Sequence, residues 1–182
     1  MKRFAMTLLA LTTAISLTAC GGGKKGASDP ADVKGETYSA ENISALCPEG
    51  WVATGSTLWY SETDETDPNV IIVAKGADSE ETALAYPLVQ ITYYPDDVGS
   101  MALTMEDTRE AYTETEDVET FTTGDYEWTG FKSTGGISPT YILWTELPLS
   151  VQVTIEPGSD DKNAIGPNDA EVQAILASIE AN

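Results

Sequence analysis

The sequence predicts an α+β fold, in which helices pack on an antiparallel β-sheet. The predicted elements follow one order: a strand-rich first part, a helix, a meander of strands and a terminal helix. Strands and helices that are segregated along the chain are typical of layered α+β domains. Without a signal segment at residues 1–19, the chain has 163 residues, which is the length of one domain. We therefore expect residues 37–182 to form a single α+β domain.

Turn residues and apolar runs place the strands of the first part. Pro48-Glu49-Gly50 is typical of a turn and predicts a strand on either side. Residues 70–74 form a continuous apolar run rich in β-branched side chains, which is typical of a strand covered on both faces. Residues 88–94 predict another strand, which Pro95 ends.

A helix is expected between residues 100 and 118. Thr104 followed by Asp107 is typical of an N-terminal cap. The side chains that recur at helical spacing are Met101, Met105, Thr108 and Tyr112.

Strands are expected again from residue 121. Residues 121–133 are interpreted as two strands around a turn at Gly124-Asp125, and residues 141–147 as a third. After Pro148, apolar residues alternate with polar ones over residues 149–156, which predicts a strand with one buried and one exposed face.

The last element is expected to be a helix. Asn168 followed by Glu171 is typical of a helix N-terminal cap. The following apolar residues recur at positions i, i+3, i+4 and i+7, which predicts one buried face: Val172, Ile175, Leu176 and Ile179.

Three segments carry a resemblance to a known family. They are residues 44–51 (SALCPEGW), 126–130 (YEWTG) and 169–179 (DAEVQAILASI). These segments resemble the PsbP-like α-β-α sandwich superfamily, whose bacterial members include DcrB-type and other small lipoproteins. The resemblance implies an α-β-α sandwich and a binding or accessory role at a membrane. It transfers no catalytic residue.

The N-terminus has the layout of a secretory signal. Lys2 and Arg3 precede an apolar run that ends near Leu17, and this run is shorter than the roughly 20 residues of a membrane-spanning helix. The sequence Leu17-Thr18-Ala19-Cys20 resembles the lipobox of bacterial lipoproteins, in which a diacylglycerol is attached to the cysteine thiol. We expect residues 1–19 to be a removed lipoprotein signal peptide. The alternative is an ordinary cleavable signal.

The lipid on Cys20 predicts where the protein is found. Buried acyl chains hold a protein on a bilayer, so we expect a lipid-anchored protein on the extracytoplasmic side of the cell membrane. Residues 20–36 are rich in Gly, Ala, Ser and Lys and contain no aromatic residue. Such a composition is typical of a flexible tether.

The charge of the chain excludes one class of partner. Removing residues 1–19 leaves seven basic and 30 acidic residues, a net charge of −23. Nucleic acids and anionic lipid headgroups are bound through Lys and Arg, so binding to nucleic acid is excluded. A basic partner, such as another envelope protein, or a bound cation stays open.

The chain contains no histidine and, beyond Cys20, one cysteine, Cys47. These counts exclude a Ser-His-Asp or Cys-His nucleophile and a Cys/His zinc site. We interpret Cys47 as a buried structural side chain and expect no enzyme activity. Two carboxylates suffice for glycoside hydrolysis, so a carboxylate-based cell-wall hydrolase is the alternative.

An acidic loop is the candidate metal site. Its oxygen-bearing side chains suit a hard cation such as calcium, and no other cofactor is expected. The candidate ligands are Glu62, Asp64, Asp67 and Asn69, with Glu65 beside them, and a weaker candidate combines Asp160, Asp161 and Asn163. Solvent-exposed acidic loops without a ligand are the alternative.

Taken with the predicted anchor, these exclusions favour a non-catalytic binding or accessory protein that assists a membrane or envelope assembly. The alternative within binding proteins is a receptor lipoprotein for a solute or glycan, with a groove lined by aromatic residues. The candidates for such a groove are Trp51, Trp59, Trp128 and Trp144. Aromatic residues in strands are more often part of the core, which is the expectation here.

Overall fold

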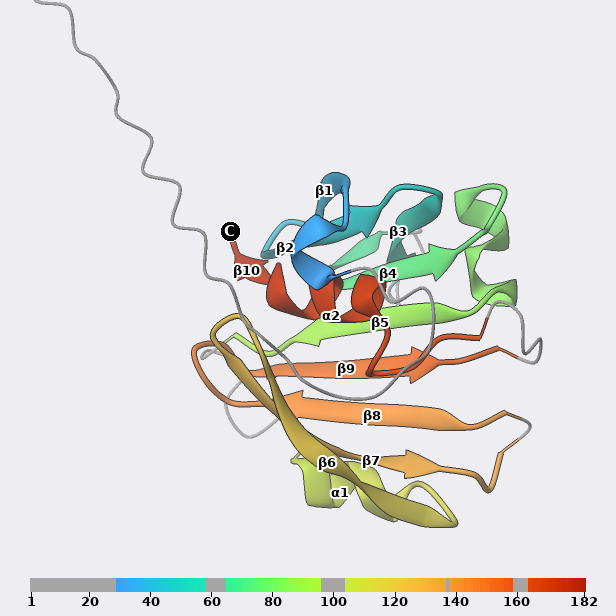
Figure 1. Ribbon diagram of the computed structural model, residues 1–182, viewed down its shortest axis with the longest axis vertical. Coiled ribbons are helices and arrows are strands. Elements are labelled where there is room, and N and C mark those ends of the chain that lie inside the picture. Colours follow the sequence, from blue (N-terminus) through green and yellow to red (C-terminus); the bar gives the residue numbers. More distant parts are fainter. Residues whose placement is uncertain (1–28, 58–64, 96–103, 137, 159–163) are drawn as a thin grey trace, which may run out of the picture.

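The computed structural model describes residues 29–57, 65–95, 104–136, 138–158 and 164–182. They form two antiparallel sheets and two α-helices (Figure 1). The larger sheet has seven strands in the order β3-β4-β5-β9-β8-β7-β6, and the smaller has three in the order β1-β2-β10.

The strands of the smaller sheet are β1 (Gly35–Ser39), β2 (Ile43–Pro48) and β10 (Glu180–Ala181). Those of the larger sheet are β3 (Trp51–Thr57), β4 (Thr66–Lys75), β5 (Leu88–Tyr93), β6 (Thr115–Thr123), β7 (Tyr126–Ser133), β8 (Thr140–Thr145) and β9 (Val151–Glu156). The α-helices are α1 (Met105–Glu110) and α2 (Ala170–Ala177), and two 3₁₀ helices are η1 (Pro30–Asp32) and η2 (Glu80–Ala85).

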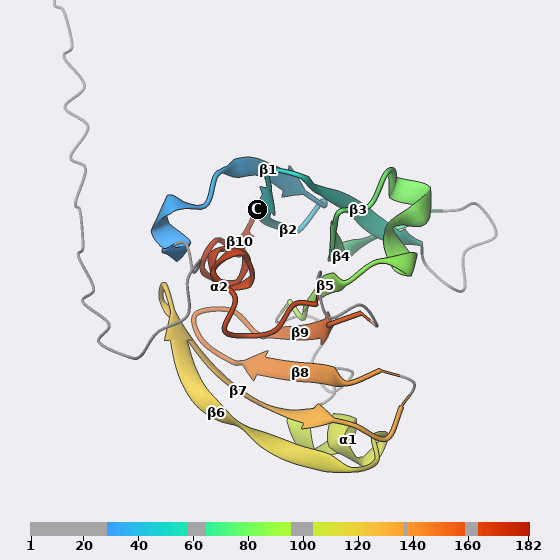
Figure 2. The same ribbon diagram turned by 45° about the vertical axis from the view of Figure 1, so that its right-hand side comes forward.

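The predicted α+β class, with its PsbP-like α-β-α sandwich, is wrong. The described fold is mostly β, and its α-helices have only six and eight residues. The layer that faces the large sheet is built from the small sheet together with α2, rather than from helices alone. Figure 2 shows α2 on the concave side of the curved large sheet.

The concave face of the large sheet holds the main core. Its apolar side chains pack against α2 and β2. The predicted stripe is buried, with Val172, Ile175 and Leu176 in α2 and Ile179 just after its end, each no more than 1% exposed. The predicted terminal helix is therefore confirmed. Its N-terminal cap is Asp169 and not Asn168. The Asp169 side chain accepts a hydrogen bond from the Gly166 backbone N–H (2.6 Å), which orders the entry to the helix.

Two predicted strand patterns are confirmed by burial. Residues 70–74 of β4 are all buried, because the concave core covers one face and η2 covers the other. In β9, Val151, Val153 and Ile155 are fully buried, whereas Gln152 and Thr154 on the opposite face are partly exposed.

The predicted helix between residues 100 and 118 is partly wrong. Thr104 and Asp107 do form the predicted capping box, but the helix ends at Glu110, and residues 115–123 form β6. Within β6, Thr115, Val118 and Phe121 are less exposed than the residues between them, and the register with β7 shifts between Val118 and Phe121. This spacing of three imitates helical periodicity.

The two predicted turns that contain glycine are confirmed. Gly50 and Gly124 have φ of 81° and 57°, which favour glycine. The Gly124 turn joins β6 to β7 as a hairpin. The Pro48–Gly50 turn instead carries the chain from the small sheet to the large one, since β2 and β3 belong to different sheets.

The described part of the chain begins within the segment assigned from sequence to the tether. Residues 29–36 include η1, which packs near α2, and the first two residues of β1. A Cβ atom on Gly35 would clash with the backbone of Cys47 and Pro48 on β2, so this strand position requires glycine. No described helix has both the length and the apolar character needed to cross a membrane.

Candidate functional site

The candidate site is an open groove between the two sheets. β1 is an edge strand of the small sheet and β3 an edge strand of the large one, and both lie at the same end of the molecule (Figures 1 and 2). The groove between them has a volume of about 570 Å³. It is lined by residues 35–38 of β1, the 47–50 turn region, the start of β3 and one residue of η2. Its size falls in the range of about 300–1,000 Å³ that is typical of ligand pockets.

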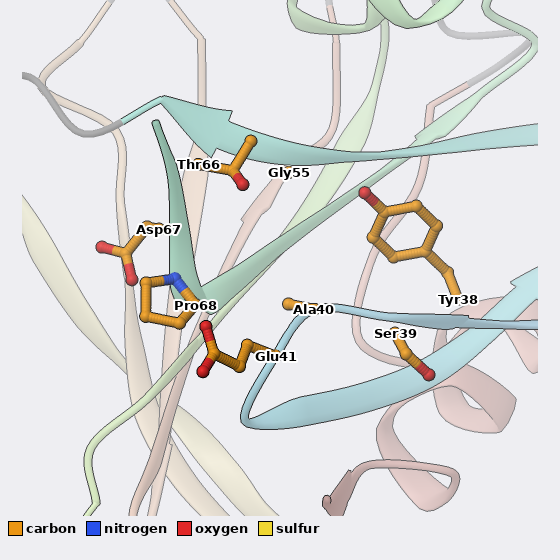
Figure 3. A pocket seen from close by; sticks show the side chains of 8 residues that line it. All are labelled: Tyr38, Ser39, Ala40, Glu41, Gly55, Thr66, Asp67 and Pro68. Carbon is orange, nitrogen blue, oxygen red and sulfur yellow. The ribbon is translucent and has the colours of Figure 1, made fainter. Parts of the chain in front are cut away.

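Tyr38 separates this groove from a smaller pocket. Its side chain extends from β1 towards Gly55 of β3 (Figure 3), and it lines both hollows. The smaller pocket has a volume of about 180 Å³ and also contains Glu41 and Asp67. Burial raises the pKa of the Tyr38 phenol, the Glu80 carboxylate raises it further, and a hydrogen bond with the Gly55 backbone acts in the opposite direction.

The rim of the groove is acidic. Glu36 from β1, Glu49 from the turn and Glu80 from η2 all line it, and all three are solvent-exposed. Glu80 is held beside β3 by a hydrogen bond from the Thr54 hydroxyl (3.5 Å). No Lys or Arg is among the described residues that line the groove. The uncompensated carboxylates give this surface a negative potential, which favours a cationic ligand.

Trp51 contributes an aromatic side chain to the lining of the groove. Trp51 is 7% exposed, and Lys75 Nζ lies 5.5 Å from the centre of its ring. The same Lys75 forms an ion pair with Glu171 of α2 (2.8 Å). Beside this groove, the Lys75 ammonium group thus contacts both the Trp51 ring and the Glu171 carboxylate.

Cys47 also lines the groove. Its thiol donates a hydrogen bond to the Trp51 carbonyl (3.5 Å). Burial raises the pKa of the thiol, and the nearby Glu36 carboxylate raises it further. The raised pKa makes the thiol a poorer nucleophile than an ordinary cysteine. The side chain is partly exposed and lines the groove, so the full burial expected from the sequence is not observed.

Two of the four predicted calcium ligands are described. The Asp67 carboxylate accepts a hydrogen bond from the Asn69 backbone N–H (2.9 Å), and the Asn69 side-chain oxygen accepts one from the Asn42 amide (2.9 Å). Glu62 and Asp64 lie outside the described residues, as do Asp160, Asp161 and Asn163. Within the described segments no three His, Cys, Asp or Glu side chains come close enough to hold a metal.

The described tryptophans are in the protein interior. Trp51, Trp128 and Trp144 are at most 8% exposed, as expected for core residues, and Trp59 lies outside the described residues. They form no exposed aromatic platform for a sugar.

Of the groove residues, Trp51 is a candidate from the sequence, whereas the acidic residues and Tyr38 are not. Glu36 falls in the predicted tether, Tyr38 at the start of the predicted domain, and Glu80 in no predicted element. Pairing of β1 with β2 and packing of η2 beside β3 bring these three segments together. One sequence feature does indicate an acidic surface in this region. Residues 35–81 contain many carboxylates and a single basic residue, Lys75.

In comparisons with known proteins, no protein-family model matches the chain, and no curated protein matches it. The assignment of the chain to the lipoproteins thus stays a prediction, which depends on residues 17–20.

Proposed function

We propose that the protein is a lipid-anchored, extracytoplasmic, non-catalytic binding protein and that the groove between β1 and β3 holds a cationic ligand. The observation that carries the proposal is the composition of the groove: three exposed carboxylates, a tyrosine and a tryptophan, and no basic side chain among its described lining residues. A cationic ligand would be drawn to this site by the net charge of −23 and held by the local carboxylates.

The location in the proposal comes from the N-terminal sequence. A lipobox at residues 17–20 would be modified with a diacylglycerol on Cys20, and the glycine- and lysine-rich composition after Cys20 is typical of a flexible tether. Membrane attachment would place the groove where it meets segments of other envelope proteins.

Glu81 and Asp107 are unsuited to the role of general acid in a hydrolase. A carboxylate-based hydrolase needs a general acid whose pKa is raised by an apolar setting. Hydrogen bonds from Ser79 and Thr104 instead lower the pKa of Glu81 and Asp107, respectively. Neither residue lines the groove.

The binding part of the proposal is tested with spermine as a probe. Calorimetric titration of the mature lipidated protein in detergent should detect binding that weakens as salt rises. The triple variant Glu36→Gln, Glu49→Gln, Glu80→Gln should lose it. A matched control is Glu106→Gln, Glu119→Gln, Glu127→Gln, which removes the same charge from exposed positions outside the groove. An equal loss in both triple variants would mean that total charge and not the groove binds the probe.

The location is tested separately by mass spectrometry of the protein extracted from membranes. The expected N-terminal residue is Cys20 carrying a diacylglycerol thioether. An unmodified Cys20, or protein recovered from the cytosol, would contradict the lipid anchor.

A further inference from the structure

The hydrogen bonds at the two ends of β1 fix which of its backbone groups are free. The Glu49 N–H donates to the Lys34 carbonyl, and the Ala40 N–H donates to the Ile43 carbonyl, both at 2.9 Å. In an antiparallel pair, residues that exchange hydrogen bonds alternate with residues that do not. Because β1 and β2 pair without a register shift, residues 34, 36, 38 and 40 direct their backbone groups towards β2.

The intervening residues of β1 direct their backbone groups the other way. The N–H and C=O groups of Gly35, Thr37 and Ser39 point to the free edge of the small sheet. Within the described part of the chain these groups have no hydrogen-bond partner. All three residues are exposed. β1 thus presents a row of regularly spaced donors and acceptors, as an added strand requires.

The other sheet edges are protected, and β1 is not. β6 has a register shift and exposed acidic side chains, β3 has a register shift and Glu80 of η2 beside it, and β10 has two residues. Such bulges, charges, covers and short strands prevent pairing with other chains. β1 is five residues long, pairs regularly with β2 and contains neither proline nor lysine.

The groove follows this free edge. Residues 35–38 of β1 line it consecutively, whereas β3 contributes the alternate residues Trp51 and Ala53. Alternate residues lie on one face of a strand, so β3 presents a face to the groove. The lining residues of β1 include Gly35 and Thr37, whose backbone groups point to the free edge, so a strand added to β1 would lie beside the groove and its acidic rim.

From these placements we infer that the ligand of the groove is an extended polypeptide segment with lysine side chains at alternate positions, which adds as a fourth strand to the free edge of β1. This inference rests on the proposed function of the groove. Backbone groups of Gly35, Thr37 and Ser39 bind the main chain, and Glu36, Glu49 and Glu80 bind the ammonium groups. A second copy of this chain is a poor occupant, because pairing of β1 with β1 would bring two Glu36-bearing acidic rims together.

The test uses the mature lipidated protein in detergent and the peptide Lys-Val-Lys-Val-Lys-Val-Lys with blocked ends. Two further peptides carry N-methyl groups, one on every valine and one on every internal lysine. Lysine and valine N–H groups point to opposite edges of the extended peptide, so each modification blocks one edge and leaves the charge unchanged. We expect one methylated peptide to bind at least about tenfold more weakly than the parent and the other to bind within about threefold of it.

A second measurement locates the peptide. Amide hydrogen exchange should slow at Gly35, Thr37 and Ser39 when the parent peptide binds and stay unchanged at Glu36 and Tyr38, whose N–H groups already bond to β2. Equal binding of all three peptides would mean that charge alone holds them. This result, or binding of spermine without binding of the parent peptide, would overturn the added strand and leave the proposed function intact. Failure of both spermine and the parent peptide to bind would overturn the proposed function as well.

Discussion

The Tyr126 hydroxyl donates a hydrogen bond of 2.6 Å to the carbonyl of Ile179. Tyr126 begins β7 in the large sheet, and Ile179 lies between α2 and β10, which belongs to the small sheet. Both residues are buried. This bond therefore links the large sheet to the segment between α2 and β10. Because β10 pairs with β2, and β2 pairs with β1, the bond also supports the small sheet.

Replacing Tyr126 with phenylalanine should destabilise the protein. The variant leaves the Ile179 carbonyl buried without its partner, so the free energy of unfolding should fall by about 1–3 kcal/mol in urea denaturation. Tyr86→Phe is the matched control, because it removes a hydroxyl whose bond to Asp78 is exposed, and it should change stability little. Equal effects in the two variants would contradict a structural role for the Tyr126 bond.

A second buried hydrogen bond supports the core between β6 and β7. Trp128 Nε1 donates to the hydroxyl of Thr123 at 2.8 Å. Thr123→Val keeps the shape of the side chain but leaves the indole N–H unpaired, and the free energy of unfolding should fall by about 1–3 kcal/mol. Thr123→Ser keeps the acceptor and should lose only about 1 kcal/mol, for the missing methyl group. A serine variant as unstable as the valine variant would show that packing dominates at this position.

Local sequence patterns predicted those elements in which the order of apolar and polar residues matches the order of buried and exposed side chains. The alternation in residues 149–156 predicted β9, and the apolar run at residues 70–74 predicted the doubly covered β4. The stripe of α2 was likewise visible, since every third or fourth residue contacts the core. Residues 121–123 of β6 were predicted as strand, but residues 115–118 were assigned to the preceding helix. In that part of β6 a spacing of three replaces the usual alternation, and the register with β7 shifts after Val118.

The arrangement of these elements depends on pairings between distant segments, which no local pattern records. β5 pairs with β9, although residues 94–150 separate them, and β10 pairs with β2 from the opposite end of the chain. The turn at residues 48–50 was predicted to lie between two strands, but the pattern does not record that these strands belong to different sheets. For the same reason the groove could not be predicted: Glu36, Glu49 and Glu80 become neighbours only when both sheets form.

The reactivity of Cys47 offers a test of the groove's electrostatics. Burial and the Glu36 carboxylate raise the pKa of this thiol, so at pH 8 a smaller fraction is thiolate than for an ordinary cysteine, whose pKa is about 8.5. Alkylation by iodoacetamide should therefore be slow and should accelerate as the pH rises above about 9. Glu36→Gln should accelerate it at pH 8, and the control Glu41→Gln should not. Identical rates in both variants would contradict the assigned influence of Glu36.

Buried tyrosines should make the protein sensitive to alkali. Burial is the main cause that raises the pKa of Tyr38, Tyr94, Tyr112 and Tyr126. The folded protein thus holds these phenolic protons more tightly than the unfolded chain, in which tyrosine has a pKa of about 10. The stabilising contribution is complete below about pH 10 and is lost as the pH rises through the higher pKa values of the folded state. Urea denaturation at pH 8, 10 and 11 should therefore show a free energy of unfolding that falls above about pH 10. Tyr94→Phe should show a shallower fall, and an equally steep one would mean that Tyr94 does not contribute.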